Sequence, residues 1–147
     1  MCIRDRYYYP QVTEAVRAAG KLPNLYVTDF IKDMAAAYAA SDLVISRAGA
    51  GSISEFCLLH KPVVLVPSPN VAEDHQTKNA LALVDKQAAI YVKDSEAEAK
   101  LMDVALKTVA DDQKLKELSD NIAKLALPDS ARIIAQEVIK LAEAENK

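Results

Sequence analysis

Residues 47–55, with the sequence Arg-Ala-Gly-Ala-Gly-Ser-Ile-Ser-Glu, combine the residue types of an anion-binding turn. They follow a short apolar strand expected over residues 42–46 and lead into a helix expected over residues 52–59. Glycines let the backbone come close to a ligand, and the first N–H groups of a helix attract negative charge. The turn therefore predicts a phosphate or diphosphate ligand, although many α/β proteins have such a turn and bind nothing there.

A second polar group opens the helix expected over residues 75–86, where His75, Gln76 and Asn79 occur. Gln76 and Asn79 are three residues apart and share one helix face. Each amide both donates and accepts hydrogen bonds, which suits recognition of sugar hydroxyls. The same spacing is equally typical of a plain surface helix, and a lone histidine at a helix start is often only solvated.

The turn itself also has purely structural interpretations. Ser52 and Glu55 have the spacing of a capping box, in which both side chains bind backbone N–H groups of their own helix. Arg47 could pair with a carboxylate of the protein instead of a phosphate, and Phe30 could belong to the core. From the residues alone, ligand binding and helix capping both remain open for Ser52 and Glu55.

Alternating helices and strands position these groups and predict an α/β fold with a parallel sheet and right-handed crossovers. The expected strands cover residues 25–28, 42–46, 63–66 and 89–92. The expected helices cover residues 10–19, 34–40, 52–59, 75–86, 96–110, 113–126 and 130–145. Ligands of such sheets bind at the carboxyl ends of the strands, where residues 29–34, 47–55 and 70–79 fall.

Several single residues sharpen this picture. Asp33 is expected to cap the helix that follows it, and Cys57 to be a buried thiol. The run Val63–Val66 is apolar throughout, as in a strand buried on both faces. The last helix is expected to turn an apolar stripe inward; its members are Ile133, Ile134, Val138 and Leu141.

Length and composition indicate one ordinary globular domain of 147 residues. The net charge of −3 gives no general attraction to nucleic acid, and no apolar run is long enough to span a membrane. The two cysteines and two histidines are not spaced as zinc ligands, so no structural zinc site is expected. No other metal and no cofactor are expected either. Residues 1–9 differ in character from the rest and are expected to be a disordered or artefactual start.

The order and spacing of several motifs resemble the C-terminal domain of the MurG family, bacterial enzymes of glycosyltransferase family 28. The matching segments are 27–34 (Val-Thr-Asp-Phe-Ile-Lys-Asp-Met), 41–55 (Ser-Asp-Leu-Val-Ile-Ser followed by the glycine turn), Lys61-Pro62 with Pro67, and 74–80 (Asp-His-Gln-Thr-Lys-Asn-Ala). The resemblance implies a GT-B architecture, in which two Rossmann-like domains enclose the active site. Residues 10–147 would form a partial nucleotide-sugar-binding domain that lacks its first strand and ends in a helical tail.

The resemblance also implies a site for UDP-N-acetylglucosamine. Phe30 and Ile31 would lie against the uracil, with Met34 bordering the site. Glu55 would accept hydrogen bonds from the ribose. The remaining positions would face the diphosphate or the sugar: Arg47, Gly49, Ala50, Gly51, Ser52, His75, Gln76 and Asn79. With this resemblance, the ligand interpretation is preferred for Glu55, Gln76 and Asn79.

The family implies partners outside this sequence. It transfers N-acetylglucosamine to a lipid-linked muramoyl-pentapeptide, and its N-terminal domain supplies the acceptor site, the proposed general base and a membrane-facing surface. We therefore expect no catalytic residue in this chain, no transfer activity by the chain alone, and a homodimer through surfaces that truncation exposes. The expected location is cytoplasmic, with the full-length protein peripheral at the cytoplasmic face of the plasma membrane.

Two other functions remain open. The chain could come from another UDP-sugar enzyme of GT-B architecture or a UDP-N-acetylglucosamine epimerase, which Gln76 and Asn79 argue against mildly. It could also be a non-catalytic nucleotide-binding module. The chain has no complete G-x-G-x-x-G motif and no acidic cluster at the strand ends, which argues against a dinucleotide-dependent dehydrogenase and a phosphoacceptor domain.

Overall fold

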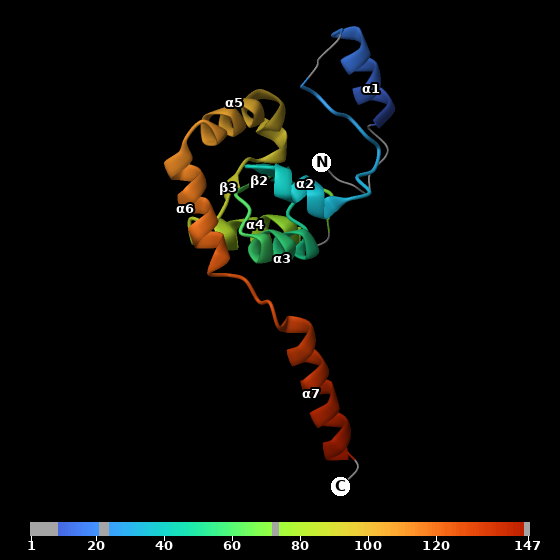
Figure 1. The fold of residues 1–147 in the computed structure, drawn as a ribbon, viewed down its shortest axis with the longest axis vertical. Helices are drawn as coiled ribbons and strands as arrows, with labels where there is room; N and C mark the ends of the chain where they lie inside the picture. Colours follow the sequence, from blue (N-terminus) through green and yellow to red (C-terminus); the bar gives the residue numbers. More distant parts are fainter. Residues whose placement is uncertain (1–8, 21–23, 72–73, 146–147) are drawn as a thin grey trace.

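The computed structural model describes residues 9–20, 24–71 and 74–145, and shows a small α/β domain from which one long helix extends (Figure 1). Its strands are β1 (Val44–Ser46), β2 (Val63–Leu65) and β3 (Ile90–Tyr91). Its helices are α1 (Tyr9–Ala18), α2 (Met34–Ala40), α3 (Ala50–Leu59), α4 (His75–Val84), the 3-10 helix η3 (Asp94–Glu96), α5 (Ala97–Val109), α6 (Asp112–Ala123) and α7 (Ser130–Glu145).

The three strands of the described sheet are all parallel, in the order β1-β2-β3, as the sequence predicts. The central strand β2 pairs with both neighbours, Val64 standing opposite Ile45 on one side and Ile90 on the other. All three of its residues are fully buried, which confirms the expected strand buried on both faces. A parallel sheet has this property because helices cover both of its faces.

Successive side chains of β2 point to opposite faces and divide the core into two clusters. Val63 and Leu65 join the larger cluster with Phe56 of α3, Ala80 of α4 and Ile122 of α6. Val64 belongs to the smaller cluster, against which partly buried side chains of α5 pack; these are Ala97, Leu101 and Val104. Cys57 lies in the larger cluster as a buried free thiol, as predicted.

The strand expected over residues 25–28 does not form. Leu25 and Tyr26 are 49% and 86% exposed, and the segment pairs with none of the three strands in the described part of the chain. The hydroxyl of Thr28 instead donates to the backbone carbonyl of Phe30 and accepts from its N–H, which holds a local turn. Side-chain bonds of this kind compete with strand pairing.

The inward orientation expected for the apolar stripe of α7 is also wrong. α7 extends away from the domain (Figure 1), and its described side chains from Ala131 to Ala144 are all exposed. The stripe residues are between 50% and 68% exposed; they are Ile133, Ile134, Val138 and Leu141. The segment between α6 and α7, which contains Pro128, leads the helix away from the core.

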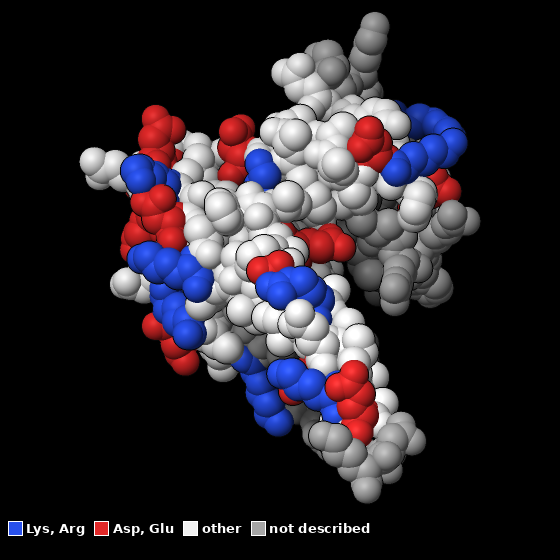
Figure 2. All heavy atoms as spheres, turned by 60° about the horizontal axis from the view of Figure 1, so that its bottom comes forward, with Lys and Arg blue, Asp and Glu red and all other residues white. Residues whose placement is uncertain are grey.

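Charged side chains of both signs are mixed over the face of the molecule that Figure 2 shows. Many form short-range pairs along one helix, such as Lys114 with Glu117 and Lys116 with Asp120. Interspersed acids and bases of this kind are typical of helix faces that solvent covers. Among the described residues, none of the helices has the length and apolar character needed to cross a membrane.

Candidate functional site

A cavity of about 830 Å³ lies beside the carboxyl end of β1, between α2 and the beginning of α3. Ten of the twelve predicted site residues line it: Phe30, Ile31, Met34, Arg47, Gly49, Ala50, Gly51, Ser52, Glu55 and Gln76. The walls continue over apolar side chains of β1 and α2. The fold therefore brings together three segments that are separated in the sequence.

The beginning of α3 differs from the prediction. The helix starts at Ala50 instead of Ser52, and its N-cap residue is Gly49, which has no side chain to cap with. The first intrahelical bond at this end runs from Ile53 N–H to the Gly49 carbonyl, so the N–H groups of the preceding residues have no acceptor within the helix. The Ser52–Glu55 capping box does not form because Ser52 lies inside the helix.

The glycines of the turn are not required by the backbone conformation. Gly49 has φ −70°, which any residue adopts, and a Cβ atom added to Gly49 or Gly51 would meet no other atom within 4 Å. Glycine inside a helix is unfavourable compared with alanine. Both glycines line the cavity, where the absence of a side chain leaves the backbone open to it, and their role toward a ligand stays a prediction.

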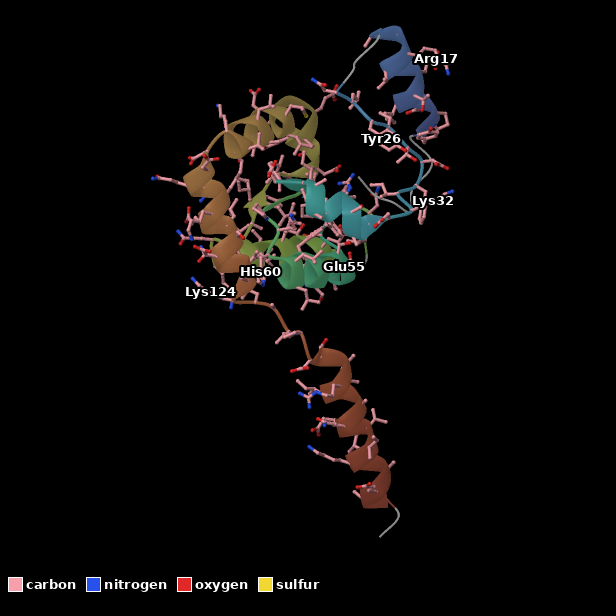
Figure 3. All side chains as sticks on the ribbon, viewed as in Figure 1. Arg17, Tyr26, Lys32, Glu55, His60 and Lys124 are labelled. Carbon is pink, nitrogen blue, oxygen red and sulfur yellow. The ribbon has the colours of Figure 1, made fainter. Side chains whose placement is uncertain are left out.

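Glu55 has a partner that the sequence analysis did not identify. The hydroxyl of Tyr38 on α2 donates to Glu55 Oε2 over 3.0 Å, and Figure 3 shows Glu55 on α3 where this helix lies near α2. Tyr38 lies four residues after Met34, on the same face of α2, and that spacing was the available signal. Burial and the adjacent Glu55 carboxylate raise the pKa of Tyr38 from 10.0 to about 12.

The raised pKa of Tyr38 predicts a pH dependence of stability. An unfolded tyrosine loses its proton near pH 10, whereas the folded protein keeps this one until about pH 12. The contribution of this tyrosine to the free energy of unfolding is complete below pH 10 and is lost as the pH rises to 12. We therefore expect the free energy of unfolding to fall more steeply across this range in the wild type than in Tyr38→Phe, as measured by urea denaturation. Parallel pH profiles of the two proteins would contradict this assignment.

Arg47 joins the carboxyl ends of all three strands. Arg47 comes directly after β1. Its guanidinium donates to the carbonyls of Val66 and Pro67, which follow β2, over 3.1 and 3.3 Å, and it forms an ion pair with Asp94, which follows β3. The structure thus contains the carboxylate partner that was the alternative to a phosphate. Arg47 still lines the cavity, so its role toward a ligand stays a prediction.

Gln76 and Asn79 both hold the glycine turn through Ala48. Gln76 Oε1 accepts from the N–H groups of Ala48 and Ser68 over 3.3 and 2.9 Å. Asn79 Nδ2 donates to the Ala48 carbonyl over 3.2 Å. Ala48 is fully buried, so these amides satisfy backbone groups that water does not reach. The sequence indicated the shared helix face but not this structural task.

Two predicted residues do not line the cavity. His75 is exposed at the first position of α4, and Asn79 lies beyond Gln76 along the same helix. On the opposite wall, Asp33 caps α2 by accepting from Ala36 N–H over 2.9 Å, as predicted. This cap fixes the start of the helix that carries Met34 and Tyr38. Phe30 is 45% exposed at the cavity, so it is not a core residue.

Comparison with known proteins identifies the family of the chain. The family model described as "Glycosyltransferase family 28 C-terminal domain" matches residues 4–134. The chain belongs to this family. A Bacteroides thetaiotaomicron relative is 96% identical over 141 residues, and a Bacteroides fragilis relative is 80% identical over 138. Both are described as UDP-N-acetylglucosamine–N-acetylmuramyl-(pentapeptide) pyrophosphoryl-undecaprenol N-acetylglucosamine transferases.

The family 28 chain covers only part of these relatives. It aligns over 96% of its own length but 38% of the Bacteroides thetaiotaomicron protein. The crystal structure of Acinetobacter baumannii MurG matches 91% of the chain and 40% of that protein, with a TM-score of 0.78 and 30% sequence identity. This structural match confirms the predicted C-terminal domain fold with its helical tail.

Proposed function

We propose that the chain is the donor-binding part of a glycosyltransferase that moves N-acetylglucosamine from UDP-N-acetylglucosamine to a lipid-linked muramoyl-pentapeptide. The observation that carries this proposal is the cavity lined by ten of the residues that the family resemblance assigns to the donor site. The names of the two Bacteroides transferases support the reaction and the two substrates.

The proposed donor lies along the cavity, and each of its parts meets protein groups of complementary chemistry. Phe30 and Ile31 offer an apolar surface for the uracil, and the Glu55 carboxylate accepts from ribose hydroxyls. The diphosphate lies at the N-terminus of α3, where N–H groups and the helix dipole favour negative charge. Negative charge accumulates on the departing UDP during transfer, so the same groups stabilise the leaving group.

In the proposed site, the side-chain amides of Gln76 and Asn79 each use one atom to hold the protein backbone and leave the other for the donor. Gln76 Oε1 is engaged by two backbone N–H groups, so its Nε2 group is the part that we assign to the diphosphate or sugar. We keep His75 and Asn79 as sugar-side residues of the longer protein. Asn79 uses Nδ2 to hold Ala48, and its Oδ1 is the atom that we assign to a sugar hydroxyl.

Titration calorimetry with UDP and UDP-N-acetylglucosamine tests the proposal. We expect Glu55→Ala to weaken binding of both ligands tenfold or more, because hydrogen bonds to a charged group contribute about 1.5–3 kcal/mol. Glu98→Ala is the matched control, since Glu98 is an exposed glutamate on α5 that does not line the cavity. UDP-glucose measured alongside tests the choice of sugar.

Either of two outcomes would contradict the proposal: a folded wild-type chain that does not bind UDP, or an unchanged affinity in Glu55→Ala. Circular dichroism of each variant shows whether the fold is retained, so a loss of binding can be assigned to the site.

The remaining parts of the proposal concern the longer protein. We propose that residues outside this chain bind the lipid-linked acceptor and activate its hydroxyl, so that the chain alone binds the donor without transferring the sugar. The full-length enzyme would act at the cytoplasmic face of the plasma membrane as a peripheral protein. The exposed apolar stripe of α7 supports association with another surface, which for the isolated chain we propose to be a second copy.

A further inference from the structure

The hydrogen bond between Tyr38 and Glu55 links two walls of the cavity that contact different parts of the proposed donor. Tyr38 belongs to α2, which also carries Met34 on the uracil side. Glu55 belongs to α3, whose N-terminus faces the diphosphate. The two residues are 17 positions apart, and their side chains meet at 3.0 Å. The ribose of a nucleotide lies between its base and its diphosphate. The Tyr38–Glu55 pair likewise lies between the walls proposed for the uracil and for the diphosphate.

The tyrosine ring is held by the core. Its centroid lies 5.9 Å from that of Phe56, and the two rings meet edge to face at 86°. Phe56 is 1% exposed and neighbours Glu55 on α3, so it cannot move without disturbing the core. A ring fixed in this way gives its hydroxyl a defined position. The glutamate side chain, by contrast, is exposed and has several rotatable bonds.

We propose that Tyr38 is a positioning residue that orients the Glu55 carboxylate for hydrogen bonds from the ribose hydroxyls of the donor. The inference rests on the proposed function and assigns a task to a residue that does not itself have to touch the ribose. A carboxylate has two oxygens with about four acceptor sites, so the single bond to Oε2 leaves Oε1 for the ligand. Because the carboxylate is already oriented before the ligand binds, less side-chain conformational entropy is lost on binding.

Burial and the neighbouring carboxylate keep the tyrosine protonated far above neutral pH, with a pKa of about 12. The hydroxyl therefore stays a donor under all conditions in which a nucleotide sugar would bind. A hydroxyl whose proton is committed to Glu55 is unsuited to general acid chemistry at neutral pH, which agrees with a role in positioning.

The test compares UDP with 2′,3′-dideoxy-UDP, which lacks both ribose hydroxyls. We expect Tyr38→Phe to weaken binding of UDP about fivefold and to leave binding of the dideoxy ligand unchanged. The substitution removes only the hydroxyl and keeps the ring against Phe56. Tyr91→Phe is the matched control, because Tyr91 packs against the same core cluster and does not line the cavity. Glu55→Gln, which keeps the side-chain shape, shows how much the carboxylate itself contributes.

The outcomes separate the inference from the proposed function. If the folded wild-type chain does not bind UDP, the proposed function fails and the inference fails with it. If UDP binding is weakened in Glu55→Gln but not in Tyr38→Phe, the donor site stands and the positioning role is wrong. An equal loss for both ligands in Tyr38→Phe would show a merely structural role and would also overturn the inference.

Discussion

Phe56→Ala is expected to lower the free energy of unfolding by about 3–5 kcal/mol, as large aromatic truncations in well-packed cores do. Phe56 is 1% exposed and belongs to the cluster in which α3, α4 and α6 pack on the sheet. Typical domains have only about 5–15 kcal/mol of stability, so the loss is a large fraction of the total. Urea denaturation followed by circular dichroism measures it.

Phe30→Ala is the matched control for this experiment. Phe30 is 45% exposed at the cavity, so its truncation leaves no buried void. We expect Phe30→Ala to change the free energy of unfolding by no more than about 0.5 kcal/mol. It should weaken UDP binding, because the proposed uracil site loses an apolar surface. A small effect of Phe56→Ala, similar to that of Phe30→Ala, would mean that the core cluster is not packed as the structure shows.

Substitutions at Gln76 are expected to separate folding from ligand binding. Gln76→Ala removes the acceptor for two backbone N–H groups, one of them on fully buried Ala48, and should destabilise the protein by about 1–3 kcal/mol. Gln76→Glu keeps an oxygen for the same N–H groups, so its stability should stay close to that of the wild type. It also places a negative charge beside the proposed diphosphate site, and UDP affinity should fall tenfold or more.

Two measurements check these expectations for Gln76. Urea denaturation ranks the stabilities, and calorimetry compares UDP with uridine, which has no phosphate and should bind Gln76→Glu as it binds the wild type. Gln113→Glu is the matched control, because it makes the same change on an exposed residue of α6. Equal losses of UDP and uridine affinity in Gln76→Glu would place the diphosphate elsewhere.

The central elements of the fold follow from local features of the sequence. The apolar run at Val63–Val66 predicted a strand buried on both faces, and Asp33 predicted the start of α2, because each signal is local. The prediction of a strand over residues 25–28 was wrong for the opposite reason. Its apolar residues are typical of a strand, but strand pairing depends on a neighbour that lies elsewhere in the chain. In the same way, the sequence identifies the apolar face of α7 but does not indicate what, if anything, packs against it.

The same division applies to the candidate site. Residue types and spacing identified the glycine turn and the polar residues of α4, and the resemblance to the MurG family connected them with a nucleotide sugar. The tertiary structure alone decided that Tyr38 is the partner of Glu55 and that Arg47 joins all three strand ends. It also decided that Gln76 and Asn79 hold the peptide groups of Ala48. These contacts join segments 17 to 47 positions apart, and only folding brings such segments within hydrogen-bond distance.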